Sequence, residues 1–278
     1  MTEPPTAIEI VRQPRAMRPE LAVFDFDGTL SLIRAGWQNV MVPMMVECLE
    51  ALGTGRSRED LRALAAADVA RSSGRLTIQQ MMGLARRVAE FGGAPLDPRQ
   101  YKAEYGRRLL RHIGARREAL ASGAAAPDEM LLAGSRGMLA ALAAAGVTLA
   151  LFSGTDEPYV REEAHLLGID RYFGQHIYGA LDDYEASGKD RVVARLLAAR
   201  SAAGDRLLVF GDDFVEIEAV KAAGGYAVGV ASDESAWGGR TVAAKRARLL
   251  EAGADMIVCD FAEHKAIARL LVPESRRA

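Results

Sequence analysis

Residues 21–30 read LAVFDFDGTL, an apolar run that ends in two aspartates one residue apart. Its four leading apolar residues have the length of a buried strand, and they end abruptly in a polar segment. Because side chains on an extended segment alternate with a period of two, the sequence predicts that Asp25 and Asp27 point the same way. Two carboxylates this close repel each other unless a cation or a proton is shared between them.

Other apolar runs of strand length follow along the chain. Residues 147–152 are followed by Ser-Gly-Thr, and residues 206–210 are followed by Gly-Asp-Asp. Weaker runs cover residues 226–230 and 255–259. Residues 7–11 have prolines on both sides and are expected to form at most a short edge strand.

Helical patterns alternate with the later runs, and they cover residues 134–145, 157–167, 189–199, 216–223, 245–252 and 263–271. Apolar strands that alternate with helices favour a parallel sheet with both faces covered. The sequence therefore predicts an α/β protein whose core is a Rossmann-like, doubly wound parallel sheet.

The segment 32–130 breaks this alternation. It carries helical patterns and no convincing strand, with helices expected near residues 37–52, 57–71, 77–91 and 97–117. Pro43 is expected to kink the first of these helices or to mark its start, and the Met41, Met44 and Met45 cluster is expected to pack in its core. We predict a flexible leader at 1–19, a core domain at 20–31 and 131–278, and an inserted helical cap domain at 32–130.

Composition excludes several classes of protein. The 278 residues carry a formal net charge of −2, which argues against a protein whose main partner is nucleic acid. No apolar stretch is long enough to span a membrane, and the polar N-terminus lacks a signal-peptide core. Cys48 and Cys259 have no second Cys or His at metal-ligand spacing, which indicates reduced thiols. We expect a soluble cytoplasmic protein, and its oligomeric state is left open.

The strand ends carry the chemistry. In an open parallel sheet, ligands bind at the edge formed by the carboxyl ends of the strands. Asp25 and Asp27 would meet Asp212 and Asp213 there, and oxygen ligands of this kind favour Mg²⁺. Ser153 and Lys189 add donors that suit the oxygens of a transferring phosphoryl group. This set describes phosphoryl transfer through an aspartyl phosphate.

The chain resembles the haloacid dehalogenase (HAD) superfamily, on its phosphatase side. Residues 25–30 (DFDGTL) match its DxDGT(L) motif, and residues 153–155 (SGT) match its second motif. Lys189 in Ser-Gly-Lys matches the third motif, and residues 211–216 (GDDFVE) resemble the acidic fourth motif. The order and approximate spacing agree over about residues 20 to 260.

The resemblance implies roles for these residues. Asp25 would be the nucleophile and a metal ligand. Asp27 would protonate the leaving oxygen and then take a proton from the attacking water, while its backbone carbonyl reaches the metal. Lys189 would neutralise charge on Asp25 and on the phosphoryl group, to which it would also bind.

Further roles follow from the same motifs. Thr29, Ser153 and Gly154 would bind phosphate oxygens, Asp212 would bind Mg²⁺ directly, and Asp213 would bind through water or orient the ligands. The family usually has Asp where this chain has Glu216. That residue would contact a metal-bound water or Lys189, or would only favour the helix dipole.

An insert between the first and second motifs resembles the helical cap of the superfamily's C1 branch, which closes over the site and meets the leaving group. Arg34, Trp37 and Gln38 are candidates for contacting substrate, or are simply the first turn of a cap helix. Residues 229–234 with 245–255 resemble HAD domains loosely associated with sugar metabolism, an analogy that does not identify a substrate.

Several functions remain open at this point. A Mg²⁺-dependent phosphatase for a small phosphomonoester, such as a sugar phosphate, leads. A phosphomutase of the β-phosphoglucomutase kind shares the motifs and the cap type. A dehalogenase needs neither Asp27 nor a metal, and a phosphonatase needs a cap lysine, for which Lys102 has no supporting context. A binding or regulatory module with a vestigial site is the alternative from another class.

Overall fold

The computed structural model describes residues 8–14, 17–181, 204–236 and 238–272. The chain divides into two compact units, which are Met1–Ala35 with Ala119–Ala278, and Gly36–Glu118. The first contains the sheet and the second is helical. The predicted cap range of 32–130 is wider than the helical unit at both ends.

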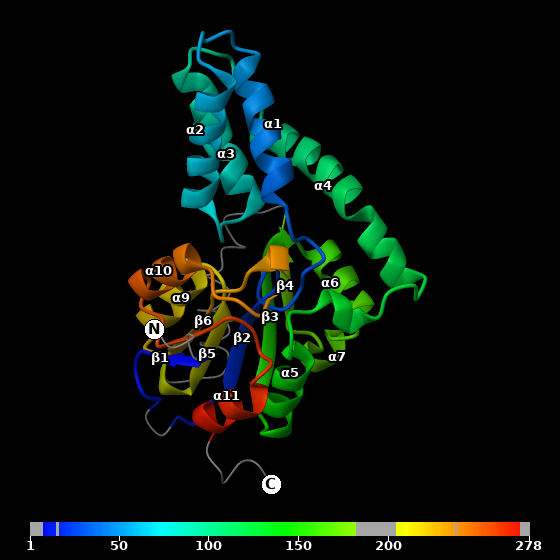
Figure 1. Ribbon diagram of the computed structural model, residues 1–278, viewed down its shortest axis with the longest axis vertical. Coiled ribbons are helices and arrows are strands. Elements are labelled where there is room, and N and C mark those ends of the chain that lie inside the picture. Colours follow the sequence, from blue (N-terminus) through cyan, green and yellow to red (C-terminus); the bar gives the residue numbers. More distant parts are fainter. Residues whose placement is uncertain (1–7, 15–16, 182–203, 237, 273–278) are drawn as a thin grey trace, which may run out of the picture. The chain divides into compact units, whose positions relative to one another are not determined.

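The sheet unit is an α/β structure around a seven-stranded sheet (Figure 1). Its strands are β1 (Ile8–Ile10), β2 (Leu21–Asp25), β3 (Thr148–Asp156), β4 (Ile177–Ala180), β5 (Leu207–Gly211), β6 (Tyr226–Val230) and β7 (Met256–Val258). Its helices are α5 (Ser135–Ala144), α6 (Glu157–Leu166), α7 (Asp170–Phe173), α9 (Phe214–Ala222), α10 (Ala243–Glu251) and α11 (His264–Leu271). Short 3₁₀ turns are η1 (Pro127–Met130), η2 (Gly204–Arg206) and η3 (Glu234–Ala236).

The strand order is β1-β7-β6-β5-β2-β3-β4. All neighbouring pairs are parallel except β1 with β7, which is the expected short edge strand. Numbered from β2 onward, the six parallel strands have the doubly wound order 3-2-1-4-5-6. The predicted fold class is therefore confirmed, with one antiparallel strand added at the edge.

Both faces of the sheet are covered, as a parallel sheet requires. Val23 of β2 belongs to a buried cluster that includes Ile217 of α9 and Leu249 of α10. The next residue, Phe24, points to the opposite face, where its ring stacks on Phe210 at 4.4 Å and also contacts two further aromatic rings, those of Phe173 and Phe261. The unbroken apolar run of β2 is explained by burial on both sides.

The helical unit contains α1 (Gln38–Glu50), α2 (Arg58–Ser72), α3 (Thr77–Glu90) and most of α4 (Pro98–Ala121). These helices lie where the sequence predicts them. Helix α1 begins five residues before Pro43, so the proline does not mark its start. Met41, Met44 and Met45 are buried, as expected for core residues.

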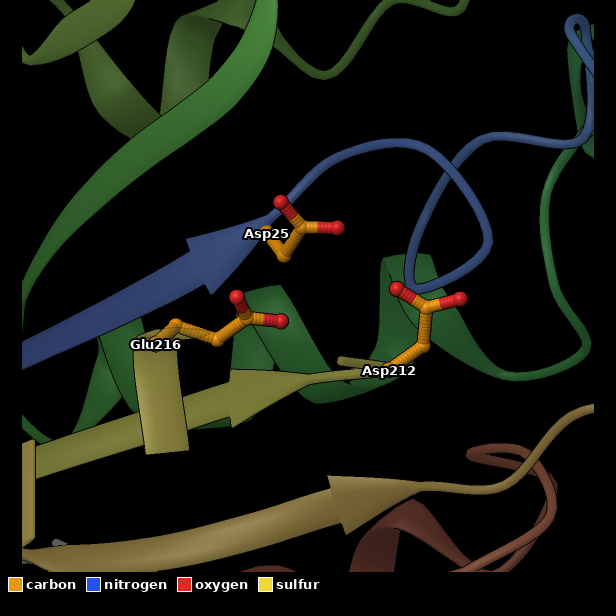
Figure 2. A group of neighbouring side chains, drawn as sticks. All are labelled: Asp25, Asp212 and Glu216. Carbon is orange, nitrogen blue, oxygen red and sulfur yellow. The ribbon is translucent and has the colours of Figure 1, made fainter. Parts of the chain in front are cut away.

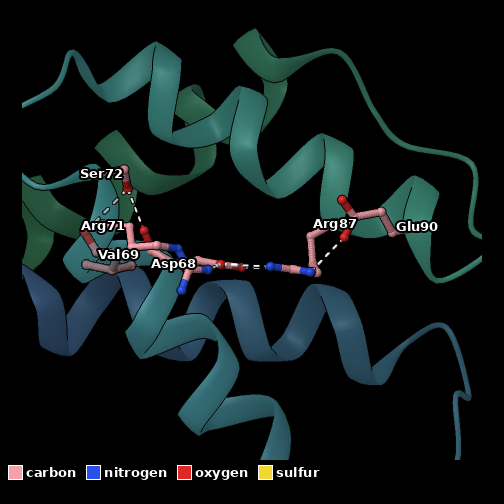
Figure 3. Close-up of polar contacts among 6 residues, drawn as sticks. All are labelled: Asp68, Val69, Arg71, Ser72, Arg87 and Glu90. Carbon is pink, nitrogen blue, oxygen red and sulfur yellow. Dashed lines mark hydrogen bonds and ion pairs between the residues drawn. The ribbon is translucent and has the colours of Figure 1, made fainter.

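Charged side chains link α2 to α3 within this unit (Figure 3). Arg87 donates from Nε to Asp68 Oδ2 at 3.0 Å and from Nη2 to Asp68 Oδ1 at 2.8 Å. Arg87 also bonds Glu90 at 2.7 Å, and Arg71 pairs with the same Asp68. A forked guanidinium–carboxylate pair fixes direction as well as distance, so it orients α3 against α2.

Gly134 fixes the start of α5 and supplies a test of packing in the sheet unit. It has φ of +75°, and a Cβ there would lie 1.8 Å from the Phe261 carbonyl oxygen. We expect Gly134→Ala to lower the free energy of unfolding by about 2 to 4 kcal/mol, because the left-handed conformation and the overlap both cost energy. Urea denaturation measures this.

Gly146→Ala is the matched control. Gly146 has a similar φ of +73°, but nothing lies within 4 Å of the added Cβ. We expect it to cost only about 1 to 2 kcal/mol, the conformational part of the penalty. Equal losses in the two variants would show that the contact with Phe261 contributes nothing.

Candidate active site

Three strand ends bring the predicted residues together. Asp25 is the last residue of β2, Asp212 directly follows β5, and Ser153 lies in the C-terminal part of β3. Since β5, β2 and β3 are adjacent and parallel, these ends share one edge of the sheet. The crossovers change direction between β2 and β5, and such a switch point is where ligands bind in open α/β sheets.

An acidic cluster occupies this edge (Figure 2). Asp25, Asp212 and Glu216 each offer a carboxylate oxygen, and these oxygens lie within 4.8 Å of one another. Asp25 and Glu216 are buried, and Asp212 is mostly buried. Three enclosed carboxylates repel one another, and a divalent cation that prefers oxygen ligands relieves that repulsion. The donor set therefore fits the Mg²⁺ that the sequence predicts.

Glu216 lies both at the start of a helix and in the acidic cluster, and a role for it at a metal stays a prediction. It lies in the first turn of α9, where it accepts a hydrogen bond from the Asp213 backbone N–H at 3.0 Å, and it also belongs to the acidic cluster. Asp213 caps the same helix by accepting from the Phe214 N–H at 2.8 Å. A Cβ on Gly211 would lie 2.3 Å from Glu216, so the glycine leaves room for the longer side chain.

Asp27 has surroundings of its own, and its carboxylate is not one of the three in the cluster. Its Oδ2 accepts hydrogen bonds from Ser153 Oγ at 3.0 Å and from Thr155 Oγ1 at 3.2 Å. Although 24% of the side chain stays exposed, Oδ1 is enclosed, with no hydrogen-bond partner among the described residues. Burial raises the pKa of Asp27 to about 6, while the charge of Arg34 acts in the opposite direction. A carboxyl group with this pKa can carry a proton near neutral pH.

Arg34 is held inside the sheet unit by an ion pair. Its Nε and Nη2 donate to the two carboxylate oxygens of Glu163 in α6, at 2.9 and 2.8 Å. Both side chains are buried, and Glu163 is fully so. Arg34 Nε also lies 3.8 Å from Asp27 Oδ1. The arginine that the sequence nominates for substrate contact is therefore anchored beside Asp27.

The remaining predicted residues are placed as follows. Thr29 is fully buried, and its hydroxyl has no hydrogen-bond partner among the residues that the structure describes. A buried hydroxyl of this kind fits a missing acceptor such as a phosphate oxygen. Gly154 lies in β3 between Ser153 and Thr155. Lys189 and the helix expected at 189–199 lie outside the described residues.

Trp37 and Gln38 belong to the helical unit, at the start of α1. A role for either in substrate binding stays a prediction. Cys48 is half-buried and Cys259 is buried, and both are free, as expected. None of the described helices is both long and apolar enough to cross a membrane.

The structure also brings in residues to which the sequence analysis assigned no role. Lys245 Nζ lies 2.6 Å from Asp212 Oδ2 and 2.9 Å from Glu234 Oε1. Burial opposes the charge on Lys245, but the two carboxylates outweigh this effect and raise its pKa. Thr155 and Glu163 are the other additions. Thr155 has a signal in the sequence, because it is the third residue of the Ser-Gly-Thr motif, and Lys245 and Glu234 lie in the two stretches whose resemblance was noted without a role.

A doubly wound parallel sheet with a helical insert after its first parallel strand, and with an acidic cluster at the strand ends, defines an α/β protein whose ligand site lies at the carboxyl edge of the sheet. The family model of haloacid dehalogenase-like hydrolases matches residues 19–224. The chain belongs to this family. A search of curated protein sequences found no match.

Solved structures with the same fold are distant in sequence. A HAD family hydrolase from Deinococcus radiodurans R1, with bound phosphate and sodium, is 18% identical, with 92% of this chain and 99% of that chain covered and a TM-score of 0.53. A protein from Haemophilus somnus 129PT, described as a predicted phosphoglycolate phosphatase, is 19% identical, with 92% and 100% covered and a TM-score of 0.55. A haloacid dehalogenase-like protein from Agrobacterium tumefaciens C58 is 18% identical, with 90% and 97% covered and a TM-score of 0.56.

Proposed function

We propose that this chain is a Mg²⁺-dependent phosphatase that hydrolyses a small phosphomonoester, such as a sugar phosphate, through an aspartyl phosphate on Asp25. The observation that carries the proposal is that the carboxylates at one sheet edge have different surroundings. Asp25 lies in a cluster suited to a metal, while Asp27 is held apart by Ser153 and Thr155. Nucleophile and proton donor thus have different environments.

The first half-reaction transfers the phosphoryl group to the protein. A carboxylate oxygen of Asp25 attacks phosphorus, the bond from phosphorus to the ester oxygen breaks, and Asp27 gives its proton to the departing alcohol oxygen. Asp25 must be ionised for this step and Asp27 must be protonated. The raised pKa of Asp27 supports the second requirement.

The second half-reaction regenerates Asp25. Asp27, now ionised, takes a proton from a water molecule whose oxygen attacks phosphorus, and the bond from phosphorus to Asp25 breaks to release phosphate. The buried Thr29 hydroxyl and Ser153 are the proposed phosphate contacts, and Lys189 is proposed to add a positive charge there. Mg²⁺ bound by Asp25, Asp212 and the Asp27 carbonyl, with Asp213 and Glu216 in support, would supply a fixed charge that stabilises the transferring oxygens.

A phosphate-release screen tests the proposed function. The purified chain is incubated with phosphorylated metabolites, including hexose phosphates and phosphoglycolate, in Mg²⁺ and in EDTA. We expect release from at least one small phosphomonoester, its loss in EDTA because the acidic cluster then lacks its cation, and its recovery when Mg²⁺ is restored.

Three outcomes would contradict the proposal. Release that continues unchanged in EDTA would exclude a metal-dependent reaction. Isomerisation of a sugar phosphate that needs a bisphosphate and releases no phosphate would identify a phosphomutase instead. Mg²⁺ binding without turnover on any compound would favour a regulatory module.

A further inference from the structure

A segment outside the four sequence motifs also reaches the acidic cluster. Residues 231–236 follow β6 and contain η3, and residues 238–245 lead into α10. The buried Ser232 hydroxyl donates to the Gly28 carbonyl oxygen at 2.7 Å, which joins this segment to the loop after β2. The segment therefore forms a wall of the candidate active site.

Lys245 connects this segment to the acidic cluster. Its Nζ lies 2.6 Å from Asp212 Oδ2, 2.9 Å from Glu234 Oε1 and 3.4 Å from Ser232 Oγ. Three oxygens thus meet the three N–H groups of the ammonium. The side chains of Lys245, Asp212 and Glu234 are each at least 85% buried. A charge enclosed this well is held in place by its partners and is little screened by solvent.

The loop after β2 is built around this ion pair. Gly28 has φ of +79°, and a Cβ there would lie 2.4 Å from Asp212 Oδ2 and 3.0 Å from Glu234 Oε1. Only glycine lets the backbone approach both carboxylates so closely. The ion pair and the Asp25–Thr29 turn are therefore parts of one packed arrangement.

We propose that Lys245 is a built-in counter-ion of the acidic cluster, which holds Asp212 in the metal-free protein and weakens the binding of a divalent cation to that carboxylate. Asp212 is paired with Lys245 and also belongs to the cluster with Asp25 and Glu216. The inference rests on the metal site of the proposed function, and it concerns how tightly that site binds Mg²⁺.

The direction of the effect follows from Coulomb's law. A fixed positive charge next to a ligand carboxylate repels an incoming cation, so its removal should tighten cation binding. The ammonium of Lys245 pairs with Glu234 as well as with Asp212. Without the charge of Glu234, Lys245 would pair more strongly with Asp212 and the site would be less negative, so cation binding should weaken. The two variants should therefore shift Mg²⁺ affinity in opposite directions.

Isothermal titration of the full chain with Mg²⁺, without substrate, tests the inference. We expect Lys245→Met to bind Mg²⁺ about tenfold more tightly and Glu234→Gln to bind it several-fold more weakly than the unchanged protein. Thermal melting supplies a second readout, in which Mg²⁺ should raise the Tm of Lys245→Met more than that of the unchanged protein.

Lys221→Met is the matched control. Lys221 Nζ lies 2.9 Å from both carboxylate oxygens of Asp255, a buried residue just before β7, at the opposite end of the strands from the site. This variant breaks a comparable ion pair, so it should lower the Tm without changing Mg²⁺ affinity. Lys245→Arg, which keeps the charge, should bind Mg²⁺ like the unchanged protein.

Equal or weaker Mg²⁺ binding in Lys245→Met, or tighter binding in Glu234→Gln, would overturn the inference, because a lysine that only orients Asp212 predicts weaker binding in both. If Lys245→Met does not fold, Lys245→Gln carries the same expectation. The titration needs no turnover, so a chain without phosphatase activity can still show these shifts, and an active phosphatase can lack them.

Discussion

Asp25→Asn is expected to reduce Mg²⁺-dependent phosphate release on the order of 10⁴-fold or more, the size of effect that loss of a nucleophile produces. An amide does not attack phosphorus as a carboxylate does. None of the other described carboxylates lies at the end of β2, so none is placed to replace Asp25 as the nucleophile. The substitution also removes one of three mutually repelling charges. The Tm should therefore stay the same or rise while turnover is lost.

The measurement is phosphate release at saturating substrate, with thermal melting of the same preparation. Asp128→Asn is the control, because this substitution makes the same chemical change at a side chain that is 69% exposed. It should keep full activity. A variant Asp25→Asn that retains more than a tenth of the activity would rule out an aspartyl phosphate at this residue.

Asp27→Asn separates the two aspartates further. It keeps the nucleophile but loses the group that takes the proton from water. A substrate whose leaving group departs without protonation should therefore still phosphorylate Asp25, and the phosphoryl intermediate should persist. Intact-protein mass spectrometry would detect one added phosphoryl group in Asp27→Asn and none in Asp25→Asn.

The sequence predicts the frame of this site because strand ends are local features. Apolar runs that stop at Asp25, Ser153 and Asp212 identify the carboxyl edge of a parallel sheet without knowledge of the strand order. The helical insert is predictable for the same reason, because helical periodicity is also a local feature. The insert shows that periodicity and contains no convincing strand. The sequence does not predict strand β4, because its four residues, with a glycine among them, give no clear period.

Contacts between distant segments are harder to predict. Lys245 follows Asp212 by 33 residues, and its approach depends on the contact between Ser232, which follows β6, and Gly28. Arg34 and Glu163 are separated by 129 residues, and neither belongs to a motif. Surface arginines and buried ones look alike in a single sequence. Only the packing of α6 on β3 and β4 shows that Glu163 has no access to solvent.

The buried pair of Arg34 and Glu163 is expected to make a large contribution to the stability of the fold. Arg34→Met should lower the free energy of unfolding by about 3 to 5 kcal/mol, because it removes the forked ion pair that Arg34 makes with the fully buried carboxylate of Glu163. Urea denaturation of the full chain measures the loss. Arg206→Met is the control, since Arg206 pairs with Glu20 at the surface, and it should cost less than about 1 kcal/mol.

The double variant Arg34→Met/Glu163→Leu decides whether an uncompensated charge causes the loss. Replacing both members of a buried ion pair by apolar side chains of similar size is often neutral, so we expect the double variant to recover most of the stability lost in Arg34→Met. A double variant as unstable as the single one would instead assign the loss to the packing of the Arg34 side chain. Stability and activity should then separate, because the recovered protein still lacks the positive charge that Arg34 places 3.8 Å from Asp27.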